Sequence, residues 1–205
     1  MNVSYAIPVH NEHEEIDRLL GQLTKYKKPD DEIVVQCDQG NTTGNVYKVL
    51  NKYKDSIKII EFPLNKDFAT FKNNLKNHCT KEWIFQIDAD EFPDEYLIDT
   101  LHYFLRENPN TEVFWVPRIN TVEGITPEHL KKWGWVKDTQ GKINFPDYQC
   151  RILQNSPKIK WVSKVHEILQ GHTTQTQLPA NPEFCLIHPK TINRQEHQNK
   201  LYSTI

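Results

Sequence analysis

The chain has 205 residues, of which 37% are hydrophobic and 11% aromatic, and its formal net charge is −2. That length suits a single α/β domain, and a nearly neutral chain has no overall charge that would attract nucleic acid. No apolar run is long enough to cross a bilayer, the N-terminus lacks a secretory signal, and Cys37, Cys79, Cys150 and Cys185 have no zinc-like spacing. We therefore expect a cytoplasmic protein with reduced thiols and no transmembrane segment, either in solution or peripheral at a membrane surface.

Strand-like and helix-like segments alternate through the first ninety residues. Apolar runs predict strands, and helices are predicted where apolar residues recur every three or four positions. In chain order, the expected elements are a strand at 3–9, a helix ending near 27, a strand at 32–37, a helix around 46–53, a strand at 57–62, a helix from 68 and a strand from 83. This order predicts a parallel sheet with right-handed crossovers, in which ligands bind at the carboxyl ends of the strands.

Two features at the end of the first strand carry specific expectations. Pro8 is expected near the end of this strand, because a proline cannot donate a hydrogen bond within a central ladder. Asn11, with Glu14 three residues further on, predicts an N-cap and a capping box at the start of the first helix.

The most informative stretch is an apolar run followed by the acidic block 88–91. A strand with a period of two would place the carboxylates of Asp88 and Asp90 on one side, where they could share a divalent cation. Taken alone, the pattern is equally typical of an ordinary acidic strand end. Residues 10–12 and Asp38 also follow strands, so they would lie at the same edge of the sheet, which favours a binding site there.

The second half has a less regular pattern. Helices are predicted at 96–105 and 192–202, and strand-like runs occur at 113–116, 149–153, 159–169 and 184–187. Residues 121–146 show no clear period, but they are too aromatic for a simple linker. We expect this half to cover the acidic edge of the sheet. For Trp133, Trp135 and Trp161, core packing and stacking on sugar rings are both open.

Four short motifs follow one another in the first half: Ile7-Pro8-Val9-His10-Asn11-Glu12, residues 32–38, residues 68–73, and Ile87-Asp88-Ala89-Asp90-Glu91. In this combination they resemble family 2 glycosyltransferases of the GT-A fold. The later pieces 149–153, Val165-His166-Glu167 and His188 resemble the branch that includes lipopolysaccharide-core β-glucosyltransferases. The resemblance implies an α/β GT-A fold with a central, mostly parallel sheet flanked by helices. It further implies a single domain, 1–205, with a nucleotide-binding half, 1–93, and a mixed acceptor-binding half, 94–205.

The resemblance also implies an inverting, metal-dependent glycosyltransferase. Such an enzyme moves a sugar from a nucleoside diphosphate sugar, most often a UDP-sugar, to a glycan or lipid-linked glycan acceptor, with Mn²⁺ or Mg²⁺ as cofactor. The nucleotide sugar would contact Pro8, Val9, Asn11, Glu12, Asp38, Lys72, Asp88 and Ala89, and Asp90 and His188, the latter just past a strand, would bind the metal. The general base would be Glu167 or Asp147, with Glu91 as a weaker third candidate, and these alternatives stay open.

Two departures from the family pattern affect the expected donor site. Asp38 stands alone where the family usually has paired acids, and Lys72 replaces the usual arginine, so the bidentate fork of a guanidinium is lost. The alternative functions are a nucleotide-sugar-binding module without turnover and a sugar nucleotidyltransferase. The second of these is disfavoured because no glycine-rich loop follows the first strand.

Overall fold

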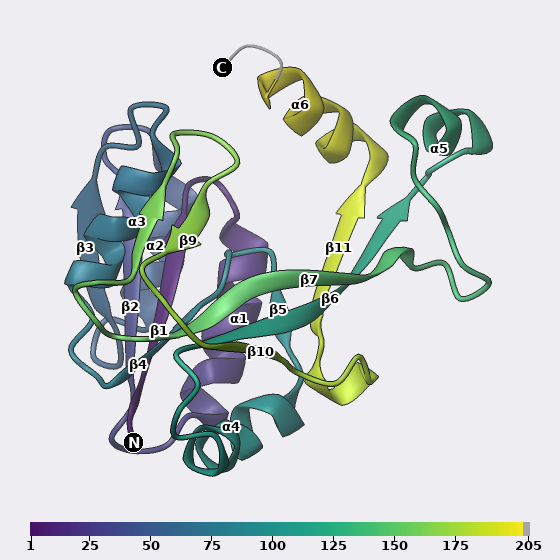
Figure 1. Ribbon diagram of the computed structural model, residues 1–205. Coiled ribbons are helices and arrows are strands. Elements are labelled where there is room, and N and C mark those ends of the chain that lie inside the picture. The colour runs from purple at the N-terminus through teal and green to yellow at the C-terminus, as the bar shows by residue number, and fades with distance from the viewer. Residues whose placement is uncertain (203–205) are drawn as a thin grey trace.

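The computed structural model describes residues 1–202, with side chains up to Lys200. The first half alternates strands and helices as expected (Figure 1). Its elements are β1 (Val3–Val9), α1 (His13–Tyr26), β2 (Glu32–Asp38), α2 (Gly44–Lys52), β3 (Lys58–Phe62), α3 (Phe68–Asn77) and β4 (Trp83–Gln86). The strands β3, β2, β1 and β4 lie side by side in that order and all run parallel, so the predicted parallel sheet is confirmed.

The second half extends the same sheet. Its elements are β5 (Phe92–Pro93), α4 (Glu95–Glu107), β6 (Val113–Glu123), α5 (Pro127–Trp133), β7 (Ile143–Gln154), β8 (Lys160–Val162), β9 (Ile168–Gln170), β10 (Gln175–Gln177), the 3-10 helix η1 (Pro182–Phe184), β11 (Leu186–Thr191) and α6 (Ile192–Tyr202). Strand β7 pairs antiparallel with both β4 and β6, and β11 pairs parallel with β6. One sheet therefore joins both halves. The division at residue 93 stays a prediction, and residues 203–205 of the second half lie outside the described part of the chain.

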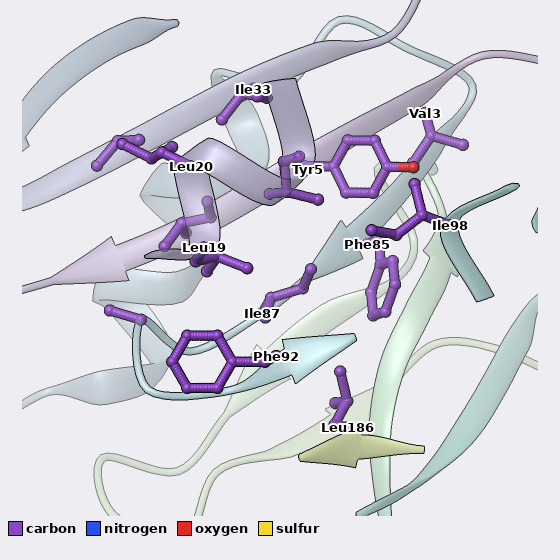
Figure 2. Close-up of a cluster of buried hydrophobic side chains, with 14 of the residues drawn as sticks. Val3, Tyr5, Leu19, Leu20, Ile33, Phe85, Ile87, Phe92, Ile98 and Leu186 are labelled. Atoms are coloured by element: carbon purple, nitrogen blue, oxygen red, sulfur yellow. The ribbon is translucent and has the colours of Figure 1, made fainter. Parts of the chain in front are cut away.

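Alternation along the strands explains how the sheet is covered on both faces. Tyr5 and Ile7 of β1 pack with the apolar faces of α1, α2 and α4. Figure 2 shows this cluster, in which the rings of Tyr5 and Phe85 lie 6.0 Å apart. Ala6 points to the opposite face, which α3 and the β8–β9 hairpin cover. The apolar positions that predicted the first three helices include the buried residues Ile16, Leu19, Leu20, Leu23, Val46, Val49, Leu50, Phe71 and Leu75.

Two expected strands differ from the structure. The run 159–169 is a hairpin rather than one strand, because Ser163 and His166 adopt positive φ angles of 75° and 54°, which a strand cannot contain. His188 was expected just past a strand, but it lies inside β11, where it is buried. The expectation for Pro8 is confirmed, since it is the last but one residue of β1 and lies beyond the part that pairs with β4.

All four cysteines are buried and free, as expected for reduced thiols. Burial raises the pKa of the Cys79 thiol to about 12, so this group stays protonated near neutral pH. Within residues 1–202, no helix combines the length and the apolar character that crossing a bilayer requires.

A glycine at the base of the β8–β9 hairpin allows a close backbone approach. Gly171 has a φ of +91°, and a Cβ atom there would overlap the carbonyl oxygen of Lys158. Gly141 has a similar φ of +84° but has open space around it. Both Gly→Ala changes should lower the free energy of unfolding by about 1–2 kcal/mol, because alanine disfavours the left-handed conformation. Gly171→Ala should lower it by about 1–3 kcal/mol more through the overlap. Urea unfolding of the two variants would measure this difference, and equal losses would contradict the close approach.

Candidate active site

A cavity of about 1010 Å³ opens at the carboxyl ends of β1, β2 and β4. Every residue that the sequence predicted for the donor, the metal or the two leading base positions lines it: Pro8, Val9, Asn11, Glu12, Asp38, Lys72, Asp88, Ala89, Asp90, Asp147, Glu167 and His188. The fold thus brings them together from both halves of the chain, at the edge where parallel sheets usually bind ligands.

At the end of β1 the chain turns sharply into α1. The expectation that Asn11 caps this helix is wrong, because α1 begins at His13 and no side chain caps it. The Glu12 carboxylate instead accepts hydrogen bonds from the backbone N–H groups of His10 (2.9 Å) and Asn11 (3.0 Å). Glu12 therefore stabilises the turn, while the exposed Asn11 lies at the cavity wall without a capping bond.

Asp38 connects two loops at the rim of the cavity. Its Oδ1 atom accepts a hydrogen bond from the N–H of Leu64, 2.9 Å away, in the loop after β3. Its Oδ2 atom accepts one from the side-chain amide of Asn41, 3.2 Å away. Asp38, the last residue of β2, is buried and already has hydrogen-bond partners, so it fixes the shape of this rim.

The acidic block divides its carboxylates among different partners. Because β4 ends before the block, Asp88 and Asp90 lie in a turn, and the strand alternation expected to align them does not apply. Asp88 pairs with Arg151, which also donates to the fully buried Glu91 at 2.6 Å. Burial raises the pKa of Asp88, but the nearby cations, above all Arg151, outweigh this and hold the pKa below its usual value. Asp88 therefore stays ionised, and Glu91 is too buried to reach a substrate.

Asp90 faces a cluster of basic groups from the end of the chain. Its Oδ2 atom lies 3.3 Å from His188 Nε2 and 3.4 Å from Arg194 Nη2. Burial opposes ionisation of this carboxyl, but the bond with His188 and the charges of Lys190 and Arg194 hold its pKa far below the usual range. Arg194 also pairs with Glu15 and so joins α6 to α1.

The donor set at Asp90 fits a cation that is shared with a substrate. Within the described residues no group of three or more His, Cys, Asp or Glu side chains could hold an ion. Asp90 and His188 supply one carboxylate oxygen and one imidazole nitrogen. Mg²⁺ is commonly bound by one or two protein carboxylates, with the remaining positions filled by phosphate oxygens and water. The residues present fit that arrangement and do not fit a closed metal site made of protein alone.

The orientation of His188 is set by two residues of the sheet. Asn120 accepts a hydrogen bond from His188 Nδ1 at 2.7 Å, and its own amide donates to Asp147 Oδ2 at 2.8 Å. Because Nδ1 donates to Asn120, the Nε2 atom that faces Asp90 carries a proton for that carboxylate in an imidazolium, and it would offer its lone pair to a metal ion in a neutral imidazole. Asp147 thus positions His188 through Asn120.

Asp147 and Glu167 have very different surroundings. Asp147 accepts two bonds from Arg118, one from Asn120 and one from Gln149, so both of its oxygens are occupied. Burial alone would raise its pKa, but these partners together lower it. Glu167 lies in the turn of the β8–β9 hairpin, where the described contacts give it one partner, Lys72. Of the two, Glu167 has the carboxylate with an oxygen, Oε2, that makes no hydrogen bond among the described contacts and could accept one from a substrate hydroxyl.

Asn73 of α3 fixes the hairpin that carries Glu167. Its amide nitrogen donates to the carbonyl oxygen of Trp161 at 2.8 Å, and its amide oxygen accepts from the N–H of Trp161 at 2.9 Å. The Trp161 ring is buried beneath Lys72, with the ammonium 4.6 Å from the ring centroid. Trp161 therefore packs in the core, and stacking on a sugar is left to Trp133 and Trp135.

The basic and amide side chains of the cavity wall that sequence reasoning missed include Arg118, Asn120, Lys190 and Arg194. Arg118 and Asn120 alternate with apolar residues, and this period of two is a signal that could have placed them on one face of β6. Lys190 lies two positions after His188 and shares its face of β11 by the same rule. Arg194 gave no such signal, because its neighbours in α6 are also polar.

The lowered pKa of Asp147 makes a prediction about acid stability. An unfolded aspartate titrates near pH 3.9, so the stabilisation by Asp147 is present above that pH and is lost as the pH falls towards the lower folded pKa. Asp147→Asn should reduce the free energy of unfolding at pH 7 by about 1.5–3 kcal/mol, the range for one hydrogen bond to a charged group. It should also flatten the dependence on pH below about 4. Urea unfolding from pH 7 to pH 3 tests both effects, and parallel curves for the two proteins would contradict them.

The sequence of the chain was compared with protein families and with curated proteins. The profile described as glycosyl transferase family 2 matches residues 4–187. Poly(ribitol-phosphate) beta-N-acetylglucosaminyltransferase TarP of Staphylococcus aureus (strain N315) is 26% identical over 109 residues, which make up 52% of this chain and 33% of TarP. The chain therefore matches about a third of the length of this curated relative.

Solved structures show a similar fold. The crystal structure of S. aureus TarS 1-349 has a TM-score of 0.65 and 15% identity, and the match covers 92% of this chain and 60% of that chain. The structure of TarS 1-349 in complex with UDP-GlcNAc has a TM-score of 0.57 and 14% identity, covering 90% and 60%. With the parallel half of the sheet, these likenesses confirm the expected α/β fold of the GT-A type.

Proposed function

This chain belongs to glycosyl transferase family 2, and from that premise we propose that it transfers a sugar from a nucleoside diphosphate sugar to a hydroxyl group of a glycan or lipid-linked glycan. The observation that carries the proposal is the shared cavity, which Asp90, His188 and Glu167 line together. We propose that residues 1–93 contribute most of the donor site and residues 94–205 most of the acceptor site.

A UDP-sugar is the donor we propose. The family resemblance favours uridine, and the TarS complex makes UDP-GlcNAc the first donor to assay. Pro8, Val9, Asn11, Glu12 and Asp38 form the rim that would surround the nucleoside. The likeness to the lipopolysaccharide-core branch and the cytoplasmic location stay predictions from the sequence.

The wall around Asp90 would receive the diphosphate. Asp90 and His188 would hold Mn²⁺ or Mg²⁺, which when bound supplies positive charge to the departing diphosphate. Lys190 and Arg194 line the same wall and can bind phosphate oxygens directly. Because Arg194 pairs with Asp90 and Glu15, we propose that it turns from these carboxylates to the phosphates when donor binds.

We propose Glu167 as the general base of an inverting reaction. The oxygen of the acceptor hydroxyl forms a bond to C1 of the donor sugar, on the face opposite the diphosphate. The bond between C1 and the diphosphate oxygen breaks, the diphosphate leaves with the electron pair, and Glu167 takes the hydroxyl proton. Asp147, which is fully hydrogen-bonded and has a lowered pKa, is proposed as a positioning residue for His188.

A thermal-shift experiment tests the donor site. UDP with Mn²⁺ should stabilise the protein by mass action, and neither UDP alone nor Mn²⁺ alone should reach the same shift. Asp90→Ala should abolish this synergy, that is, the extra thermal shift that UDP and Mn²⁺ give together. It should also lower donor hydrolysis at least about a hundredfold, because several kcal/mol of charge stabilisation are lost. Asp99→Ala, which removes an exposed acid on α4, is the matched control and should behave as the wild type.

The outcomes separate the alternatives. If no UDP-sugar binds or turns over with metal present, the proposed function is wrong. Stabilisation by UDP and Mn²⁺ without donor hydrolysis or transfer would instead favour a nucleotide-sugar-binding module. If Asp90→Ala retains the full synergy, the cation lies elsewhere.

A further inference from the structure

A projecting arm formed by residues 124–146 comprises the connection from β6 to β7 and the first four residues of β7. In Figure 1 this arm, with α5 at its tip, extends away from the sheet and its covering helices. None of the residues of α5 is buried. Its one described ion pair to the rest of the chain joins His129 Nε2 to Glu196 Oε1 of α6, at 3.6 Å. The arm therefore contributes little to the hydrophobic core.

Local bonds nevertheless give α5 a defined shape. Thr126 and His129 form a capping box, Pro127 occupies the first turn, and Gly134 ends the helix in the left-handed conformation with a φ of +67°. The N–H of Trp135 then bonds to the carbonyl oxygen of Leu130 at 2.9 Å. A helix of seven residues is not stable on its own, so these caps are what hold it in place. The sequence thus maintains an ordered helix that buries nothing.

The ordered arm presents a row of aromatic rings. His129 and Trp133 stack with centroids 5.2 Å apart and an interplanar angle of 19°, and Trp133 lies 4.9 Å from Trp135. Both indoles are only half-buried. Trp135 also lines the cavity that contains Asp90 and Glu167. The row of rings therefore runs from the tip of the arm into the candidate active site.

The arm also differs from the rest of the chain in charge. Residues 127–146 contain the four lysines Lys131, Lys132, Lys137 and Lys142 but only the two acids Glu128 and Asp138, a net charge of +2 in a chain of net charge −2. Lys142 lies over the ring of Phe145, 4.5 Å from its centroid. A partner suited to this surface offers flat apolar faces to the indoles and negative charge to the lysines.

We propose that the arm binds the acceptor and that this acceptor is an anionic glycan chain. This inference rests on the proposed transferase function. The apolar faces of successive sugar rings pack on Trp133 and Trp135, and acidic groups of the chain lie beside the lysines. Because Trp135 belongs to both the row of rings and the cavity, a chain on the arm directs its terminal hydroxyl towards Glu167.

Binding of two hexasaccharides, measured by calorimetry, tests the inference. Hexagalacturonate carries a carboxylate on each ring, and cellohexaose is a neutral chain with the same number of rings. Wild-type protein should bind hexagalacturonate more tightly than cellohexaose, and the affinity should fall as salt rises. Trp133→Ala should weaken binding of hexagalacturonate at least about fivefold, as for the central residues of an interface. Tyr103→Ala, which removes an exposed aromatic ring of α4, should not.

The thermal shift with UDP and Mn²⁺ keeps the two proposals apart. Trp133 does not line the donor cavity, so Trp133→Ala should retain the shift while it loses the hexasaccharide. The acceptor inference is overturned if wild-type protein binds neither hexasaccharide, if cellohexaose binds as tightly as hexagalacturonate, or if Trp133→Ala and Tyr103→Ala bind alike. Absence of a thermal shift with UDP and Mn²⁺ in the wild-type protein would instead refute the proposed donor function, whether or not the hexasaccharides bind.

Discussion

Glu167→Gln is expected to lower kcat for sugar transfer by about 10²–10⁴-fold, the range that a positioned general base contributes. The amide keeps the size and shape of the carboxylate but cannot take the hydroxyl proton. The KM for the donor should change less than kcat, because Glu167 lies in the turn of the β8–β9 hairpin and meets the predicted donor contacts only through its ion pair with Lys72. Steady-state kinetics with UDP-GlcNAc and an acceptor would provide both values.

Asp147→Asn is the matched control, since it makes the same change of acid to amide in the same cavity. If Asp147 positions His188 through Asn120, this variant should mainly raise the concentration of Mn²⁺ needed for half-maximal activity. At saturating Mn²⁺, kcat should fall much less than in Glu167→Gln. The reverse pattern, with kcat at saturating Mn²⁺ lost in Asp147→Asn and kept in Glu167→Gln, would make Asp147 the base.

The surroundings of Glu167 add a second control. Lys72 pairs with Glu167 and lies over the ring of Trp161. Asn73→Ala removes both bonds to the Trp161 backbone without touching a charged group, so it should loosen the hairpin and lower kcat. Asn73→Asp retains the acceptor oxygen and should recover part of the loss. If Asn73 had a structural role alone, Asn73→Ala would lower the stability of the protein and leave the pH profile of the remaining activity unchanged.

The parallel half of the fold was predictable because local patterns determine it. Each helix carries apolar residues at helical spacing, such as Ile16 and Leu20, and each strand is a short apolar run bounded by polar turns. Once the order of strands and helices is known, crossover handedness places the ends of β1, β2 and β4 at one edge. The position of the acidic block then follows without any knowledge of side-chain contacts.

The contacts of the second half could not be predicted in the same way. Whether 159–169 is one strand or a hairpin depends on two residues with positive φ, Ser163 and His166, neither of which is a glycine. Asp88 pairs with Arg151 and Asp90 with His188, and both partners are more than sixty positions away in the sequence. The pairing of β7 with β4 and of β11 with β6 brings them to the acids. Long-range pairing leaves no periodic trace in the sequence around the acids themselves.

Arg151→Met is expected to lower the free energy of unfolding at pH 7 by about 3–5 kcal/mol, the cost of removing one partner from a buried ion pair. Arg151 is 3% exposed and pairs with both Asp88 and Glu91. Glu91, which is fully buried, retains its bond to Arg118 at 2.8 Å, but Asp88 loses the one cation with which it forms an ion pair among the described residues. The loss therefore comes chiefly from a carboxylate that lines the cavity and is left without its ion pair. Urea unfolding at pH 7 provides the measurement.

Two further variants separate the charge from the bulk of the side chain. Arg106→Met makes the same substitution at an exposed position of α4 and should stay within about 0.5 kcal/mol of the wild type. Adding Asp88→Asn and Glu91→Gln to Arg151→Met neutralises both acids and should restore much of the lost stability, since an ion cluster around a buried arginine is replaceable by neutral groups of similar volume. Transfer activity should stay low in that triple variant, because Asp88 is predicted to contact the donor. A cost for Arg151→Met no larger than that for Arg106→Met would mean that the cluster does not stabilise the fold. The pairing of Arg151 with the acidic block would then be explained by donor binding alone.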